Sequence, residues 1–155
     1  MTRLNRTVRL NHTADNLFDL VSGIEKYPDF IRWIQSMKVE GLRDNGNVRD
    51  CVGRAKVGFK GFNETFATRV VSDATARTIN VSLVDGPLKR LQNRWVFTPR
   101  GDATDVEFFV DFEFRNLLLR ALAAANFEIA VNRIMAAFTA EADRRYGKPS
   151  PQVSR

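Results

Sequence analysis

Few side chains in this sequence could carry out acid–base, nucleophilic or metal chemistry. The single histidine is His12 and the single cysteine is Cys51, so a histidine pair, an intrachain disulfide and a cysteine-based metal cluster are excluded. A Ser-His-Asp or Cys-His site would need His12, which we expect to be a solvated residue beside a helix start. We therefore predict no catalytic constellation and no metal site.

Glu64 is the carboxylate that the sequence pattern singles out. If Lys60-Gly61 is a two-residue hairpin turn, the register pairs Phe59 with Phe62, Val57 with Glu64, Ala55 with Phe66 and Cys51 with Val70 on one apolar face. A carboxylate buried among aromatic rings could act as a base in a cyclase-like reaction. We favour the alternative that Glu64 pairs with an arginine, caps backbone groups near a cavity mouth, or is turned outward by a bulge.

The first third of the chain predicts one strand and two short helices. Leu4, Val8 and Leu10 alternate with arginines as a half-buried strand requires. Thr13 is placed to cap a short helix that ends at Gly23. A second short helix is expected around residues 24–33, where Pro28 is tolerated only in the first turn.

The remainder predicts an antiparallel sheet followed by one long helix. Turn residues such as Asp44-Asn45-Gly46-Asn47 separate alternating segments, with strands expected at Thr78–Asp85, Leu91–Pro99 and Asp105–Phe114. In the last of these, Phe109 breaks the alternation by falling on the polar face. From about Leu117 to Tyr146 the apolar period becomes helical, and a helix of that length would be ~45 Å long.

These elements predict an α+β fold in which a curved antiparallel sheet wraps around the terminal helix, with the two short helices closing one end. We expect one domain over residues 1–147 and a disordered tail over 148–155. A curved sheet cannot contact a straight helix evenly. Its concave side is therefore either filled by large side chains or leaves an elongated cavity.

The composition restricts location and partners. The chain has 155 residues, twelve of them Phe, and 24 Lys+Arg against 18 Asp+Glu, for a net charge of +6. This balance permits contact with nucleic acid, the ribosome or an anionic membrane. The richest apolar run, residues 117–125, is interrupted by Arg120, and the first residues show no secretion signal. We expect a cytoplasmic protein that spans no bilayer.

Several motifs resemble those of the coenzyme-Q-binding START-domain proteins, within the wider polyketide-cyclase/START-like superfamily. The resemblance covers about residues 3–147, and one departure is Ile34-Gln35, where many members carry a cysteine. The motifs are Tyr27-Pro28-Asp29-Phe30, Val57-Gly58-Phe59-Lys60-Gly61-Phe62, Glu64-Thr65-Phe66, Leu83-Val84-Asp85-Gly86-Pro87-Leu88-Lys89-Arg90-Leu91, Trp95-Val96-Phe97-Thr98-Pro99 and Asp111-Phe112-Glu113-Phe114.

The resemblance implies a helix-grip fold whose internal hydrophobic cavity binds ubiquinone as a carrier that supports respiratory electron transfer. No chemistry on the ligand and no covalent cofactor is implied. The same family includes a bacterial toxin that associates with the large ribosomal subunit, and the motifs do not separate the two functions. The partners expected are therefore a prenylquinone, with transient contact to the anionic inner membrane, or alternatively the ribosome. We expect no DNA binding.

A quinone site needs apolar walls and one or two hydrogen-bond donors for the ring carbonyls. We expect the Trp95 indole and the Tyr27 hydroxyl to be the donors, and the Asp85-Gly86-Pro87 turn either to form a cavity rim near Tyr27 or simply to join two strands. The predicted ligand-binding residues are Tyr27, Phe30, Trp33, Val57, Phe59, Phe62, Glu64, Phe66, Leu83, Asp85, Pro87, Leu91, Trp95, Phe97, Phe112, Phe127, Val131 and Ile134. Plain core packing is the alternative for each.

Cations on the polar strand faces predict a basic surface. Its members are Arg54, Lys56, Arg69, Lys89, Arg90 and Arg94. A solvated face is the ordinary explanation for such residues. An anionic lipid surface is the second, because a carrier must collect its ligand from a membrane. Ribosomal RNA is the third, although no RNA-binding motif is visible.

Overall fold

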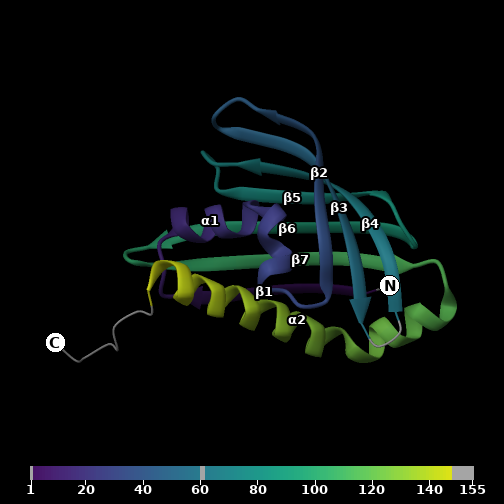
Figure 1. Cartoon of the computed structure of the whole chain (residues 1–155). Coiled ribbons are helices and arrows are strands. Elements are labelled where there is room, and N and C mark those ends of the chain that lie inside the picture. The colour runs from purple at the N-terminus through teal and green to yellow at the C-terminus, as the bar shows by residue number, and fades with distance from the viewer. Residues whose placement is uncertain (1, 60–61, 148–155) are drawn as a thin grey trace.

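The computed structural model describes residues 2–59 and 62–147, with the side chains of residues 59 and 62 left aside (Figure 1). The predicted tail, residues 148–155, and the predicted Lys60-Gly61 turn lie outside the described residues. The elements in chain order are β1 (Thr2–Leu10), α1 (Ala14–Ser22), the 3₁₀ helix η1 (Ile24–Asp29), β2 (Ile34–Asp44), β3 (Val48–Phe59), β4 (Phe62–Asp73), β5 (Thr78–Asp85), β6 (Leu88–Arg100), β7 (Ala103–Phe114) and α2 (Leu117–Tyr146).

One seven-stranded antiparallel sheet forms the body of the molecule, in the order β1-β7-β6-β5-β4-β3-β2. Strands β2 to β7 follow one another through hairpins, and β1 joins the far side by pairing with β7. The predicted hairpin register is confirmed, since Val57 pairs with Glu64, Ala55 with Phe66 and Cys51 with Val70. The apolar set of each strand therefore faces one side of the sheet.

The two short helices begin and end largely where the sequence predicts. The Thr13 side chain accepts a hydrogen bond from the backbone N–H of Asn16 at 3.2 Å, and Gly23 ends α1. The second helix is shorter than predicted and is a 3₁₀ helix that ends at Asp29. Pro28 lies in its last turn, not its first, which the short 3₁₀ element tolerates because few N–H groups there have a helical partner to lose.

Helix α2 lies along the concave side of the sheet, as predicted, with its bounds at the residues that the helical period indicated (Figure 1). Its principal neighbours are α1, β1 and β7. The Asn116 side chain caps its start by accepting from the N–H groups of Leu118 and Leu119, and Arg144 and Arg145 complement the dipole at its end.

The core lies where α1, η1 and the last half of α2 meet the sheet. Leu20, Ile79 and Val106 are almost fully buried there. Gly53 on β3 allows η1 to approach closely, because a Cβ at this position would lie 2.7 Å from the Ile24 Cδ1 atom. The predicted strand β1 contributes Leu4, Val8 and Leu10, which are half-buried against this core.

Candidate ligand-binding site

The concave face is filled with aromatic rings at the end beside η1. The Phe138 ring of α2 lies 5.3 Å from Tyr27, 5.4 Å from Phe30 and 5.4 Å from Trp95, centroid to centroid, in edge-to-face arrangements. Trp95 also meets Phe108 at 4.8 Å. Offset and edge-to-face rings are the favoured aromatic packing. This packed half contains the predicted site residues Tyr27, Phe30, Trp95, Phe97 and Val131, so those residues form core.

At the other end of the concave face, beside the β3–β4 hairpin, the described side chains pack less tightly. Val57, Phe66 and Leu83 point to the same side of the sheet as the buried Val70 but are only half-buried, and they lie outside the set packed on the core. The half-buried residues Leu91, Phe112, Phe127 and Ile134 lie on its border. We call Val57, Phe66 and Leu83 with this border the open half. The side chains of the predicted wall residues Phe59 and Phe62 lie outside the described part.

A depression of about 530 Å³ opens between the η1–β2 connection and α2. It is lined by Phe30, Ile31, Arg32, Trp33, Gly58, Arg133 and Ala137. Its lining combines apolar side chains with two cationic ones, Arg32 and Arg133. Phe30 and Trp33 are the predicted site residues that line this depression.

The two hydrogen-bond donors predicted for the ligand are already engaged within the protein. The Tyr27 hydroxyl donates to the backbone carbonyl of Val21, and burial raises the pKa of that hydroxyl well above its usual value. The Trp95 indole N–H donates to the Asn93 Oδ1 atom at 2.9 Å. Both expectations are therefore corrected, because each buried donor found a partner in the fold.

Asn93 is a polar residue of the concave face that the sequence reasoning missed. Its Nδ2 group donates to the Phe109 carbonyl at 2.8 Å, so the side chain links Trp95 to β7. The alternation of Leu91, Asn93 and Trp95 along β6 was the available signal. It places an amide among inward-facing residues, where it must be hydrogen-bonded.

Glu64 lies on the concave face in the open half, opposite Val57, as the register requires. Its side chain is half-buried and makes no hydrogen bond or ion pair within residues 2–59 and 62–147. The expected arginine partner is thus not observed there. Glu64 is the acidic side chain best placed to meet a ligand in the open half.

The Asp85-Gly86-Pro87 turn lies at the open end and not beside Tyr27. A Cβ on Gly86 would sit 3.4 Å from the Phe66 ring, and the Pro87 carbonyl accepts the Arg115 N–H at 3.1 Å, just before α2 begins. Tyr27 instead contacts Phe138. Phe138 lies 21 residues after Leu117, the first residue of α2, and at the rise of an α-helix this places it about 31 Å along the helix from the end that the turn borders. The expected proximity to Tyr27 is therefore wrong, and the turn borders the open half.

The predicted basic surface is largely neutralised by carboxylates. Arg54 pairs with Glu40 at 3.2 Å and Arg69 with Asp50 at 2.6 Å, and these arginines hold the pKa of both carboxyls below its usual range. Arg90 lies 3.2 Å from Asp111 and Lys89 lies 3.9 Å from Glu113. Only Lys56 and Arg94 of the predicted set have no carboxylate partner among the described residues. The six cations do not form one free basic patch.

His12 differs most from its prediction. The side chain is buried, and its Nε2 atom lies 2.7 Å from Asp143 Oδ1 on α2, while its backbone carbonyl accepts from the Thr104 hydroxyl at 2.7 Å. The residue therefore ties the end of β1 to the last turns of α2. His12 is buried because the segment between β1 and α1 packs against α2. This contact joins distant parts of the chain, so no local sequence pattern indicates it.

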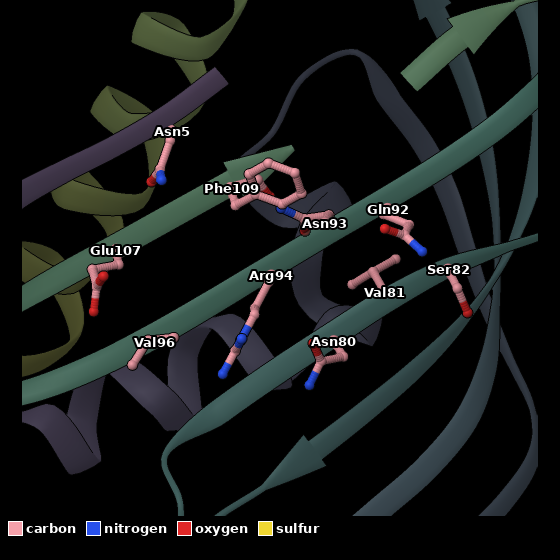
Figure 2. A pocket seen from close by; sticks show the side chains of 10 residues that line it. All are labelled: Asn5, Asn80, Val81, Ser82, Gln92, Asn93, Arg94, Val96, Glu107 and Phe109. Carbon is pink, nitrogen blue, oxygen red and sulfur yellow. The ribbon is translucent and has the colours of Figure 1, made fainter. Parts of the chain in front are cut away.

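A second depression, of about 640 Å³, lies on the opposite, convex face of the sheet (Figure 2). Asn80, Arg94 and Glu107 directly adjoin the buried Ile79, Trp95 and Phe108 on their strands, so these polar side chains point away from the core. Phe109, the ring on the polar face, lies among them. A ligand here would meet a polar surface and few of the predicted site residues. Among the described residues, no group of His, Cys, Asp and Glu could hold a metal ion.

The sequence pattern of the family described as polyketide cyclase/dehydrase and lipid transport matches residues 10–139. The chain belongs to this family. Its relatives include the ribosome association toxin RatA of Escherichia coli K12, 32% identical over 148 residues, which are 94% of this chain and 90% of that protein. Another is the mitochondrial coenzyme Q-binding protein COQ10 homolog B of Xenopus laevis, 28% identical over 144 residues. These are 90% of this chain but 57% of that protein.

Solved structures agree with this family membership. The 18 kDa protein CC1736 of Caulobacter crescentus has a TM-score of 0.80 at 45% identity, covering 95% of this chain and 99% of that one. The Zhui aromatase/cyclase of Streptomyces sp. R1128 has a TM-score of 0.79 at 19% identity, covering 94% and 95%, and shows a shared fold alone. The predicted resemblance and the helix-grip architecture are both confirmed.

Proposed function

We propose that this chain binds a lipophilic small molecule, ubiquinone or a related prenylquinone, in the open half and carries it without chemical change. One observation carries the proposal: apolar side chains such as Phe66 and Leu83 lie on the face that α2 crosses, yet are only half-buried. An isoprenoid tail placed there would remove apolar surface from water, at roughly 25 cal/mol per Å². The name of the COQ10 relative supports the choice of a quinone.

The ring carbonyls of a quinone need donors other than Tyr27 and Trp95. Arg32 and Arg133 line the depression between the η1–β2 connection and α2, which we take as the mouth of the site, and neither pairs with a carboxylate within the described residues. A guanidinium there would donate to a carbonyl oxygen while the tail extends toward the open half. We place this carrier in the cytoplasm, in transient contact with the inner membrane.

Mass spectrometry of an organic extract tests the proposal, using protein purified from its native host. We expect a prenylquinone in the wild-type extract and much less in Phe66→Asp, whose new charge would lie in the open half. Phe109→Asp is the matched control, because it places the same charge on the convex face of the same sheet. Recovery of no lipid from folded wild-type protein would refute the carrier function.

A ribosome-associated role is the second candidate, favoured by the RatA relative that matches along 94% of this chain. The cations without carboxylate partners, such as Lys56 and Arg94, could contact phosphates. Sucrose-gradient sedimentation of lysates decides the matter. A specific complex keeps the protein with the large subunit at moderate salt, whereas purely electrostatic binding falls steeply as salt rises.

An enzymatic role is the third candidate, supported by the fold shared with the Zhui aromatase/cyclase and by the position of Glu64 in the open half. Glu64→Gln keeps the shape of the side chain and removes its basicity. If the phenotype of a deletion strain is fully restored by Glu64→Gln but not by Phe66→Asp, then Glu64 does not act as the base of such a reaction.

A further inference from the structure

Helix α2 carries a second apolar face that nothing in the described chain covers. Leu117, Leu118, Leu122 and Ile129 are 73%, 68%, 51% and 55% exposed. Leu118, Leu122, Ala125 and Ile129 follow one another at helical spacing of three or four residues, on the side away from Phe127 and Val131. We call Leu117 together with this row the outer stripe of α2.

The outer stripe occupies the first half of α2 only. Beyond Ile129 the exposed positions of the helix carry Asn132, Arg133 and Arg144, as expected for a solvated surface. By length and composition α2 is also the one described helix apolar enough to cross a membrane, although little of its apolar segment is buried. The sequence did not predict so apolar a helix, because Arg120 interrupts the richest apolar run. Because Val131 and Phe138 are buried in the core, a helix lying on a surface fits better than one that spans a bilayer.

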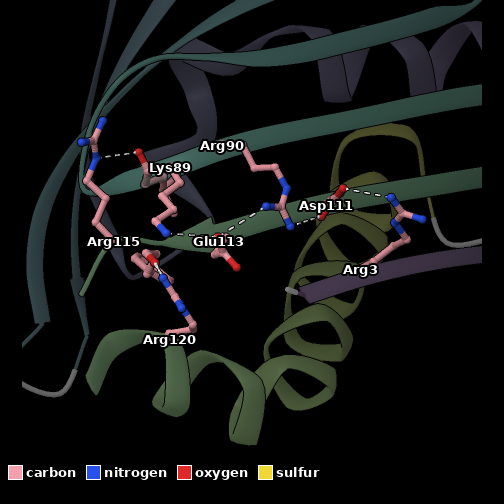
Figure 3. Close-up of polar contacts among 9 residues, drawn as sticks. Arg3, Lys89, Arg90, Asp111, Glu113, Arg115 and Arg120 are labelled. Carbon is pink, nitrogen blue, oxygen red and sulfur yellow. Dashed lines mark hydrogen bonds and ion pairs between the residues drawn. The ribbon is translucent and has the colours of Figure 1, made fainter. Parts of the chain in front are cut away.

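Several cations lie near the end of β7 and the start of α2 (Figure 3). Between Phe114 and Phe127 the chain contains Arg115 and Arg120 and no acidic residue. Both guanidinium groups donate to backbone carbonyls, Arg115 to Leu88 at 3.1 Å and Arg120 to Phe114 at 3.1 Å, and the Arg120 charge also acts on the Glu113 carboxyl, whose pKa is lowered. Around them, the carboxylates Asp111 and Glu113 are outnumbered by Arg3, Lys89 and Arg90.

We propose that the outer stripe of α2 and the cations near its start dock on an anionic phospholipid bilayer. The stripe from Leu118 to Ile129 is about 16 Å long and would insert its aliphatic side chains at the headgroup boundary. The exposed Arg115 and Lys89 would meet lipid phosphates at the same level. This rests on the proposed function in one respect, namely that a bilayer is the source of the lipophilic ligand.

Other occupants fit the same surface less well. A nucleic acid would use the cations but leave the leucines in water, and the stripe has no aromatic ring on which a base could stack. A second copy of the chain would bring a second set of the same cations to the interface. A bilayer supplies both the apolar interior and the negative charge. The stripe also leads directly to the mouth, because Ile129 lies one turn before Arg133, which lines the depression.

Vesicle flotation tests the docking, using the full chain and quinone-free vesicles of phosphatidylcholine alone or mixed with phosphatidylglycerol. We expect binding to the mixed vesicles, weaker binding to phosphatidylcholine alone, and a loss of binding as salt rises. The double variant Leu118→Gln with Leu122→Gln keeps helix propensity and should lower the partition coefficient about ten-fold or more. Leu42→Gln is the matched control, since Leu42 is equally exposed at 51% but lies on β2.

The outcomes separate this docking from the carrier function. If the protein binds vesicles but no quinone is recovered from it, the docking surface is supported and the quinone-carrier function is refuted. If quinone is recovered but the wild type and the double variant bind vesicles equally well, the docking surface is overturned and the carrier function is not. Absence of binding to phosphatidylglycerol vesicles overturns it as well, and so does light scattering that shows a wild-type dimer converted to a monomer by the double variant.

Discussion

The pair of the buried His12 and the half-buried Asp143 should stabilise the fold more than an exposed ion pair. His12 Nε2 lies 2.7 Å from Asp143 Oδ1, and the His12 side chain is 5% exposed. Removing Asp143 leaves the buried Nε2 atom of His12 without this partner. We expect a double-mutant cycle of His12→Ala and Asp143→Ala, followed by urea unfolding, to give a coupling free energy of about 1–3 kcal/mol.

The exposed pair of Arg77 and Asp15, with atoms 3.0 Å apart, is the matched control for that cycle. It also joins distant segments but remains in water, where ion pairs contribute about 0–1 kcal/mol. A coupling for His12 and Asp143 no larger than for Arg77 and Asp15 would contradict the structural role assigned to His12.

A second prediction concerns Glu141 and the dependence of stability on pH. Arg144 and Arg145 bond its buried carboxylate at 2.6 Å and 2.7 Å and lower its pKa from 4.5 to about 2. A pKa depressed by folding contributes stability above pH 4.5 that is lost as the pH falls toward 2. We expect Glu141→Gln to lower the free energy of unfolding by about 1–3 kcal/mol at neutral pH.

The same substitution should flatten the loss of stability between pH 4.5 and 2, measured by urea unfolding across that range. An unchanged acid slope in Glu141→Gln would show that other carboxylates cause the loss. Asp105 is one such group, because Arg9 and Arg100 lower its pKa to about 2.

At the residue scale, the sequence predicts which face a side chain occupies better than it predicts its partner. Glu64 lies opposite Val57 because register follows from strand alternation and turn position, both local properties. The Asp143 partner of His12 lies 131 residues away in the chain, so that contact could not be seen before the elements were assembled. The partners of Tyr27 and Trp95 are Val21 and Asn93, six and two residues away, and for Trp95 the alternation along β6 already indicated a neighbouring amide on the same face.

At the element scale, the two halves of α2 should respond differently to the same substitution. The Phe138 ring is 5% exposed and meets three other rings, so Phe138→Ala should cost about 3–5 kcal/mol of unfolding free energy. Phe127 is half-buried at the border of the open half, so Phe127→Ala should lower the free energy of unfolding by only about 1 kcal/mol. Urea unfolding measures both. Equal costs would mean that the open half is as tightly packed as the rest.

The elements themselves could largely be predicted from the sequence. The period of α2, its Asn116 cap and the alternation of β7 are strong local signals, and their bounds follow. The second helix was predicted too long, because the apolar residues Ile31, Trp33 and Ile34 continue beyond its end. These residues bury their side chains from an irregular segment and the start of β2, which periodicity does not distinguish from a helix.

At the scale of the whole molecule, the choice between a filled and an open concave side depends on the summed volume of all side chains. Trp95, Phe108 and Phe138 fill one half, whereas Phe66 and Leu83 leave the other only half-buried. The same apolar alternation in the sequence produces both halves. Composition accounts for the presence of the rings and leaves their distribution undetermined.

That division makes a final prediction about ligand-dependent stability. A ligand that binds only the folded state, present at a concentration of about 100 times its Kd, adds about 2.7 kcal/mol to the free energy of unfolding. For a chain of this size that raises Tm by about 5–10 °C. We expect this shift with decylubiquinone in a thermal melt, and a much smaller one with the tail-free dimethoxy-methylbenzoquinone, because the tail covers the open half. Phe66→Asp should abolish the shift while Phe109→Asp, on the opposite face, preserves it. Equal shifts with both quinones would assign binding to the ring alone and remove the open half from the site.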